Sequence, residues 1–146
     1  MGRLTDGSPL YVTMAEEWLV GAAFSADAED IHEVSRFVSP KDFRDHTLGV
    51  IWNAVTKVNG DPTIPRVAEY LLSDKWLDRV GAEPRLVELS AAVSPWLAAQ
   101  TRGGMVAHAK IVREWAQKRS VVSQAIKTAN DALSGKRTFR GGVQLP

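Results

Sequence analysis

At 146 residues, the chain has the length of one domain that can bury its own core. It contains no cysteine, which excludes disulfide bridges and thiolate metal sites, and no apolar run of the roughly eighteen residues that a membrane-spanning helix needs. Residues 1–9 lack the basic and then apolar pattern of a signal peptide. We therefore expect a cytoplasmic protein.

The net charge of +1 conceals an uneven distribution along the chain. Residues 1–104 contain ten Lys and Arg against fifteen Asp and Glu, whereas residues 105–146 contain eight against two. An acidic first part joined to a basic second part can attract another copy of the chain, an acidic partner or a nucleic acid. The positive charges are spread thinly over many residues, so contact with a protein is the favoured interpretation.

The chain is expected to begin with a flexible leader over residues 1–12, which contains two glycines and Pro9. Thr13 and Glu16 then have the spacing of a capping box, in which Thr closes the first turn of a helix and Glu reaches back to its start. This first helix would turn five apolar residues inward: Met14, Trp18, Leu19, Ala22 and Ala23.

Five more short helices are expected before residue 96, because apolar residues recur at the helical period and no segment alternates as a strand would. The segment from Trp96 to Gly104 is interpreted as an irregular joint. The first two of these helices cover residues 27–38 and a segment that starts at Ser39 and Pro40 and ends at Val58. The third is short and carries Val67, Tyr70 and Leu71. The fourth covers residues 74–80 and is closed by Gly81, and the fifth is opened by Pro84.

A single long helix is expected over residues 105–133, which contain neither Pro nor Gly. Gly103 and Gly104 would break the chain before it, and Ser134 with Gly135 would end it. At 1.5 Å per residue it would be roughly 40 Å long, more than a small head needs for its own core. The sequence therefore predicts an all-α fold: a head over residues 13–102, the long helix, and a basic flexible tail over residues 134–146.

No catalytic or metal-binding constellation is apparent in the sequence. The three histidines lie far apart, and none has a His or Cys partner at ligand spacing. Asp42, Asp45 and His46 are close in sequence, but they are better explained as the polar face and end of a short helix. Gly135-Lys136 resembles the end of a phosphate loop, yet Arg137 replaces the required Ser or Thr and no strand precedes it. We expect no cofactor and no metal.

Four stretches, taken in order, resemble the N-terminal domain of the bacterial replicative helicase, the DnaB family. They cover residues 14–133 approximately, and the third is the most specific. The stretches are Glu16-x-x-Leu19-Val20-Gly21-Ala22; Ser39-Pro40-x-Asp42-Phe43 followed by Ile51-Trp52-x-Ala54-Val55; Leu77-x-x-Val80-Gly81-Ala82-x-x-Arg85-Leu86-x-x-Leu89; and His108-Ala109-x-Ile111-Val112-Arg113-Glu114.

The chain departs from that family in four respects. Leu48 stands where the family has His, Arg85 stands where it has Tyr, and about five extra residues lie between Pro95 and His108. The family follows the long helix with a returning hairpin helix, a linker helix and a motor domain, and this sequence shows none of them. We therefore expect neither ATP hydrolysis nor DNA unwinding from this chain.

The resemblance implies a protein-interaction domain of DNA replication. In the family this domain forms a collar above the motor ring, pairs through helical hairpins, and docks the primase C-terminal domain and helicase loaders. We expect this chain to form a dimer or higher oligomer and to bind primase, a loader or a full-length helicase. The expected interface residues are Trp96, Met105, His108, Val112, Trp115, Arg119, Val122 and Ile126.

Two other functions remain open from the sequence. The chain could be a small nucleic-acid-binding protein that uses the long helix and the tail residues Lys136, Arg137 and Arg140. It could also be an enzyme with an unrecognised site, which the search for motifs disfavours. The sequence leaves open whether the chain is an excised domain or a free-standing protein.

Overall fold

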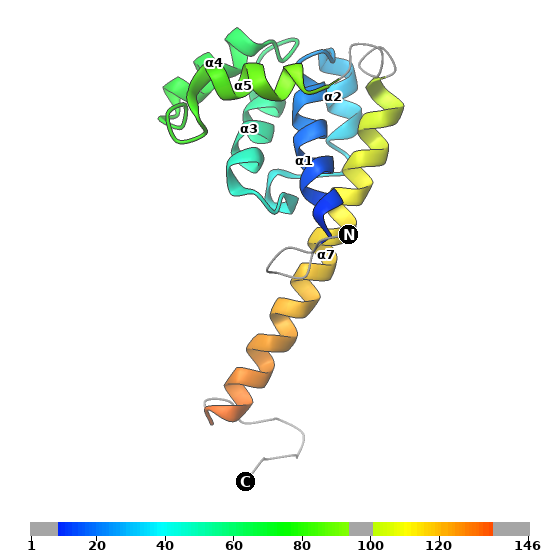
Figure 1. Cartoon of the computed structure of the whole chain (residues 1–146), viewed down its shortest axis with the longest axis vertical. Helices are drawn as coiled ribbons and strands as arrows, with labels where there is room; N and C mark the ends of the chain where they lie inside the picture. Colours follow the sequence, from blue (N-terminus) through cyan, green and yellow to red (C-terminus); the bar gives the residue numbers. More distant parts are fainter. Residues whose placement is uncertain (1–8, 94–100, 136–146) are drawn as a thin grey trace.

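In the computed structural model, residues 9–93 and 101–135 are described, and every regular element within them is helical (Figure 1). Within these residues, five α-helices and one 3-10 helix form a head, and one long helix packs along one side of the head and extends beyond it. The all-α expectation, with about six short helices before a long one, is confirmed. The elements are α1 (Leu10–Ala23), α2 (Ala28–Val34), η1 (Pro40–Asp42), α3 (His46–Lys57), α4 (Ile64–Ser73), α5 (Ala82–Ala91) and α7 (Thr101–Leu133).

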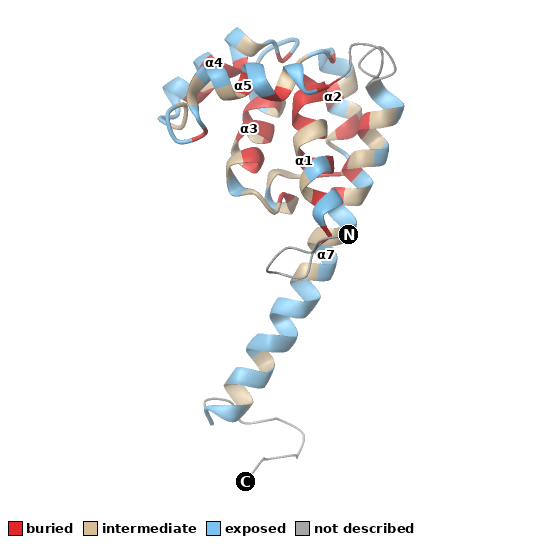
Figure 2. Cartoon of the chain, in the orientation of Figure 1, coloured by how far each residue is buried: buried red, intermediate tan, exposed pale blue. Residues whose placement is uncertain are grey.

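Helix α1 lies at the centre of the head and packs against α3, α5 and α7. Its residues Leu19 and Val20 are fully buried, as is Trp52 on α3. Trp18 and Trp76 are partly buried against the same core. Burying a large apolar side chain contributes roughly 1.5–3 kcal/mol, so the burial of these side chains stabilises the head. Figure 2 shows the buried residues gathered in the head.

Gly21 allows α1 and α5 to pack at backbone distance. A Cβ atom placed on Gly21 would lie 2.2 Å from the carbonyl oxygen of Leu89 and 2.9 Å from Cγ2 of Val93. No side chain larger than hydrogen fits there without moving one helix away from the other.

The start of α1 differs from the expectation. The helix begins at Leu10, inside the expected leader, with Pro9 as its N-cap residue. Thr13 therefore lies within the helix, where its buried hydroxyl has no hydrogen-bond partner among the described residues. The predicted capping box is wrong, because Glu16 accepts hydrogen bonds from the backbone of another segment instead. Met14 is also not inward, since 66% of it is exposed.

Two other short helices differ in extent. Residues 74–80 form turns instead of the expected helix. Lys75 has a φ of 62°, a left-handed conformation that ends α4, and the amide of Trp76 then donates to the carbonyl of Leu71 over 2.8 Å. Helix α5 starts at Ala82, two residues before Pro84, after Gly81 with a φ of 101°. Apolar periodicity does not predict the left-handed conformation of Lys75. Of Lys75 and Gly81, which are both left-handed, only Gly81 is a glycine, the residue type that usually indicates this conformation.

The segment around Pro40 forms two elements instead of one. Pro40 starts η1, but Phe43 is extended with a ψ of 130°, and α3 starts only at His46. Asp45 caps α3 by accepting hydrogen bonds from the amide of Thr47 over 2.9 Å and from its hydroxyl over 2.7 Å. Asp42, Asp45 and His46 are thus distributed over two helix starts, in agreement with the structural role expected for them.

Helix α7 begins at Thr101, so Gly103 and Gly104 lie inside it and do not break the chain before it. A Cβ atom on Gly104 would lie 3.0 Å from the ring of Trp18 on α1. Gly104 therefore makes room for an aromatic ring between the two helices, which offsets part of the cost of glycine within a helix.

Candidate protein interface on the long helix

Helix α7 has a proximal part that packs on the head and a distal part that does not. Met105, Ala109 and Val112 are fully buried against the head, chiefly by α1 and α2. From Ser120 onward, no described residue of the helix is buried, and Figures 1 and 2 show this part extending away from the other helices. Of the expected interface residues, Met105 and Val112 therefore belong to the core of the head and are inaccessible to a partner.

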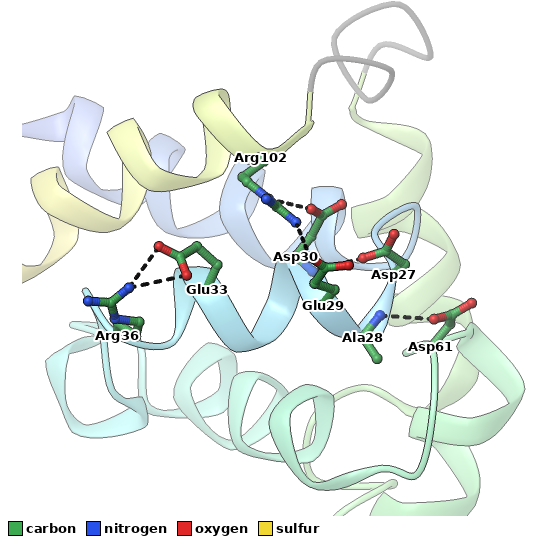
Figure 3. Close-up of polar contacts among 8 residues, drawn as sticks. All are labelled: Asp27, Ala28, Glu29, Asp30, Glu33, Arg36, Asp61 and Arg102. Atoms are coloured by element: carbon green, nitrogen blue, oxygen red, sulfur yellow. Dashed lines mark hydrogen bonds and ion pairs between the residues drawn. The ribbon is translucent and has the colours of Figure 1, made fainter.

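Ion pairs hold the start of α7 to α2. Arg102 Nε donates to Asp30 over 2.6 Å, and Nη2 of the same guanidinium lies 3.5 Å from Glu29 (Figure 3). The hydrogen bond to Asp30 raises the pKa of Arg102. Asp27 caps α2 through the amide of Asp30, and Figure 3 shows these side chains converging at the first turn of that helix.

His108 lies in the seam between α1 and α7. Its ring stacks on Trp18 with centroids 4.2 Å apart and planes at 15°. Its Nδ1 donates to the carbonyl oxygen of Gly104 over 2.7 Å. His108 is half-buried, and its ring already contacts Trp18 and Gly104 within the chain. We therefore interpret it as a residue that aligns α1 with α7.

Trp115 closes the lower end of the same seam. Its Nε1 donates to the hydroxyl of Tyr11 over 3.0 Å, and the two rings meet edge to face. The ammonium group of Lys118 lies 4.2 Å from the Trp115 ring and 3.1 Å from Glu114. Trp115 is half-exposed at the point where α7 leaves the head. An interface on the distal part of α7 would therefore begin at Trp115.

A buried carboxylate joins α1 to the α3 start and to α7. Glu16 is fully buried and accepts hydrogen bonds from the amides of Arg44 over 2.8 Å and Asp45 over 3.0 Å. Burial raises the pKa of Glu16, while the two amide hydrogen bonds and the charge of Arg119 act in the opposite direction. Arg119 Nη2 donates to the carbonyl of Asp42 over 2.9 Å. Arg119, expected at an interface, therefore ties α7 to η1.

Sequence reasoning missed this role of Glu16. The available signal was a carboxylate among apolar residues on the inward side of α1, between Val12 and Leu19. The capping pattern assigns Glu16 to a local cap, because that pattern spans four residues while the true partners lie 28 and 29 positions away.

The distal part of α7 presents two apolar stripes to solvent. Val122, Ile126, Ala129 and Leu133 are spaced by four, three and four residues, the spacing of a coiled-coil seam. Ile126 is 56% exposed and Leu133 is 87% exposed. A second stripe lies beside the first, and its small side chains line a shallow groove: Val121, Ala125, Thr128 and Ala132.

Some expected sites fall outside the described residues. Trp96 and the three tail cations Lys136, Arg137 and Arg140 all lie there. Over residues 9–93 and 101–135, no group of three His, Cys, Asp or Glu side chains could hold a metal ion. In the same part of the chain, no helix is both long enough and apolar enough to cross a bilayer.

Comparison with known proteins identifies the family. Residues 8–114 match the profile of the DnaB-like helicase N terminal domain. The crystal structure of the N-terminal domain of DnaB helicase from Mycobacterium tuberculosis superposes with a TM-score of 0.71 at 23% identity, covering 81% of this chain and 83% of that one. No curated protein sequence matches. The profile match ends at Glu114, just before α7 leaves the head. By this match, which spans most of its length, the chain belongs to the DnaB-like helicase N-terminal domain family.

Proposed function

We propose that this chain is a non-catalytic protein-interaction domain of DNA replication that acts in the cytoplasm. It associates with itself through the distal part of α7 and docks a primase C-terminal domain, a helicase loader or a full-length helicase. Family membership supports the helicase-associated role. The observation that supports the self-association is the exposed stripe of Val122, Ile126 and Leu133, which the head leaves uncovered and which is called the distal stripe below.

The large apolar side chains exposed on the distal part of α7 indicate a reversible association. Val121, Val122, Ile126 and Leu133 are 52–87% exposed. Their full burial would contribute roughly 6–12 kcal/mol per copy, at about 1.5–3 kcal/mol for each side chain. Association itself costs about 4–15 kcal/mol in lost freedom. A dimer buries these side chains on both copies, so the gain exceeds the cost of association. A surplus of about 6 kcal/mol corresponds to a dissociation constant on the order of tens of micromolar, which is the value we expect.

The structure offers less support for nucleic-acid binding as the main function. The expected tail contacts lie outside the described residues, and two of the cations on α7, Arg102 and Lys118, are ion-paired with carboxylates of the same chain. A continuous basic track along the helix is therefore interrupted.

Sedimentation velocity at tens of micromolar tests the self-association. Wild type is expected to sediment as a dimer or higher oligomer, and Ile126→Asp as a monomer, because a charge in the seam must be desolvated on pairing. Leu72→Asp on α4 is the matched control, since Leu72 is 65% exposed but lies outside the distal stripe. A wild-type monomer at this concentration, or an Ile126→Asp protein with unchanged mass, would refute the proposal.

A further inference from the structure

A second surface of the molecule has the form of a binding groove. It has a volume of about 590 Å³ and lies between the end of α2, η1 and the proximal part of α7. Its size falls in the range of about 300–1,000 Å³ that is usual for ligand sites. The groove is lined on the head side by Arg36, Phe37 and Lys41, and on the α7 side by Arg113, Ala116 and Gln117.

Cations stand on both walls of this groove. Lys41 and Arg113 are exposed, and neither has an ion-pair or hydrogen-bond partner among the described residues. Arg36 on the head side lies 3.0 Å from Glu33 and remains 65% exposed, so its guanidinium keeps free donors (Figure 3). Positive charges on two walls of one groove favour a ligand with several anionic groups.

The carboxylate of Asp42 offsets one positive charge in the groove, but within the described residues it forms no ion pair with Lys41, Arg36 or Arg113. Asp42 lines the groove, but its Oδ2 accepts hydrogen bonds from the amide of Ser39 over 2.9 Å and from its hydroxyl over 3.2 Å. It is therefore engaged in the turn that starts η1. Arg119 holds the carbonyl of the same residue from the α7 side, so this wall of the groove is fixed in place.

The floor of the groove is apolar. Val38 is 3% exposed, and Phe37 packs partly against the core beneath it. Ala116 continues this apolar strip on α7, and Gln117 adds an amide that can bond a peptide backbone. A ligand that combines carboxylates with an apolar side chain would satisfy both the walls and the floor.

We propose that this groove binds an acidic peptide segment of a partner protein, with carboxylates on Arg113 and Lys41 and an apolar side chain on the floor. A nucleic acid fits less well. Lys110 lies 5.1 Å from the centroid of Phe37 and covers a face of the ring on which a base would stack. The inference rests on the proposed protein-interaction role and names the chemistry of its docking partner, but it does not depend on pairing through the distal stripe.

Fluorescence anisotropy with a labelled octapeptide, in which pairs of Glu alternate with single Leu residues, tests the groove on the full chain. Saturable binding is expected for wild type. The double variant Lys41→Glu with Arg113→Glu should weaken it by about tenfold or more, because two attractive contacts become repulsive. Lys127→Glu is the control for charge reversal, since it makes one such reversal on an exposed residue of α7 outside the groove. It should leave the affinity within about twofold.

Further arms separate the possible outcomes. The milder pair Lys41→Gln with Arg113→Gln should also weaken binding and serves if the charge-reversed protein fails to fold. Ile126→Asp should bind the peptide normally, so that loss of pairing and loss of docking are distinguishable. Absence of saturation at millimolar peptide, or equal weakening by Lys127→Glu, would overturn the proposal. So would a labelled thymidine oligonucleotide that binds more tightly than the peptide and loses affinity in the same groove variants.

Discussion

Replacing Gly21 by Ala is expected to destabilise the fold, although alanine is the better helix former. The new Cβ atom would lie 2.2 Å from the carbonyl oxygen of Leu89, where ordinary contact begins at 3.4 Å. Helices α1 and α5 must therefore separate by about 1 Å in a close-packed core. Overpacking of this kind costs about 1–3 kcal/mol, and a clash with rigid backbone belongs at or above the upper end of that range.

The helix propensity of alanine offsets part of this cost. Replacing Gly by Ala inside a helix contributes up to about 1 kcal/mol. The free energy of unfolding of Gly21→Ala is therefore expected to be lower than that of wild type by about 2 kcal/mol. Urea denaturation, followed by far-ultraviolet circular dichroism on dilute protein, measures this difference without interference from pairing.

Gly103→Ala is the matched control for this substitution. Gly103 also lies within a helix, but a Cβ atom there meets no atom of the described residues within 4 Å. This variant should gain about 0.5–1 kcal/mol from helix propensity alone. If Gly21→Ala proved as stable as Gly103→Ala, the close approach of α1 and α5 would not be a constraint on the fold, and the reasoning would fail.

Three further predictions concern the polar contacts that hold the helices together. Glu16→Ala should lower the free energy of unfolding by about 2 kcal/mol, because the backbone amides of Arg44 and Asp45 lose their acceptor. The control Glu17→Ala should change the free energy of unfolding by less than about 0.5 kcal/mol in the same urea titration. Burial raises the pKa of Glu16 above 4.5, so the unfolded chain releases this proton first as pH rises. The stability of wild type relative to Glu16→Gln should therefore fall as pH rises above 4.5, and a difference that grows with pH would contradict the assigned shift. Arg102→Ala should lower the melting temperature at low salt, because it removes the ion pairs to α2. The effect should become smaller near 1 M salt, where the Debye length is about 3 Å. An effect of equal size at both salt concentrations would show that these ion pairs are not its cause.

The sequence by itself determined the fold class and most of the inward-facing apolar residues, although Met14 was assigned to the wrong side of α1. Leu48, Ile51, Trp52 and Val55 recur at the helical period, and all four are buried in the structure. Periodicity succeeds here because each helix must cover one side of the same core, so the apolar residues of each helix recur at the helical period. The sequence also shows the resemblance to the helicase domain, because the motifs combine these apolar positions with two glycines. Gly21 allows two helices to approach closely and Gly81 adopts a left-handed conformation, and glycine is the residue that suits both positions.

Only the tertiary structure decided which contacts each residue of α7 makes. Met105 and Ile126 both belong to the apolar pattern of the helix and cannot be distinguished by its period, yet Met105 is fully buried and Ile126 is 56% exposed. The difference depends on how far the head extends along the helix, which is a property of the other elements and their packing. The same holds for Glu16, whose partners lie far away in sequence. Local patterns fix which face of a helix is apolar, whereas the reach of neighbouring elements fixes which part of that face is covered and which remains free to bind.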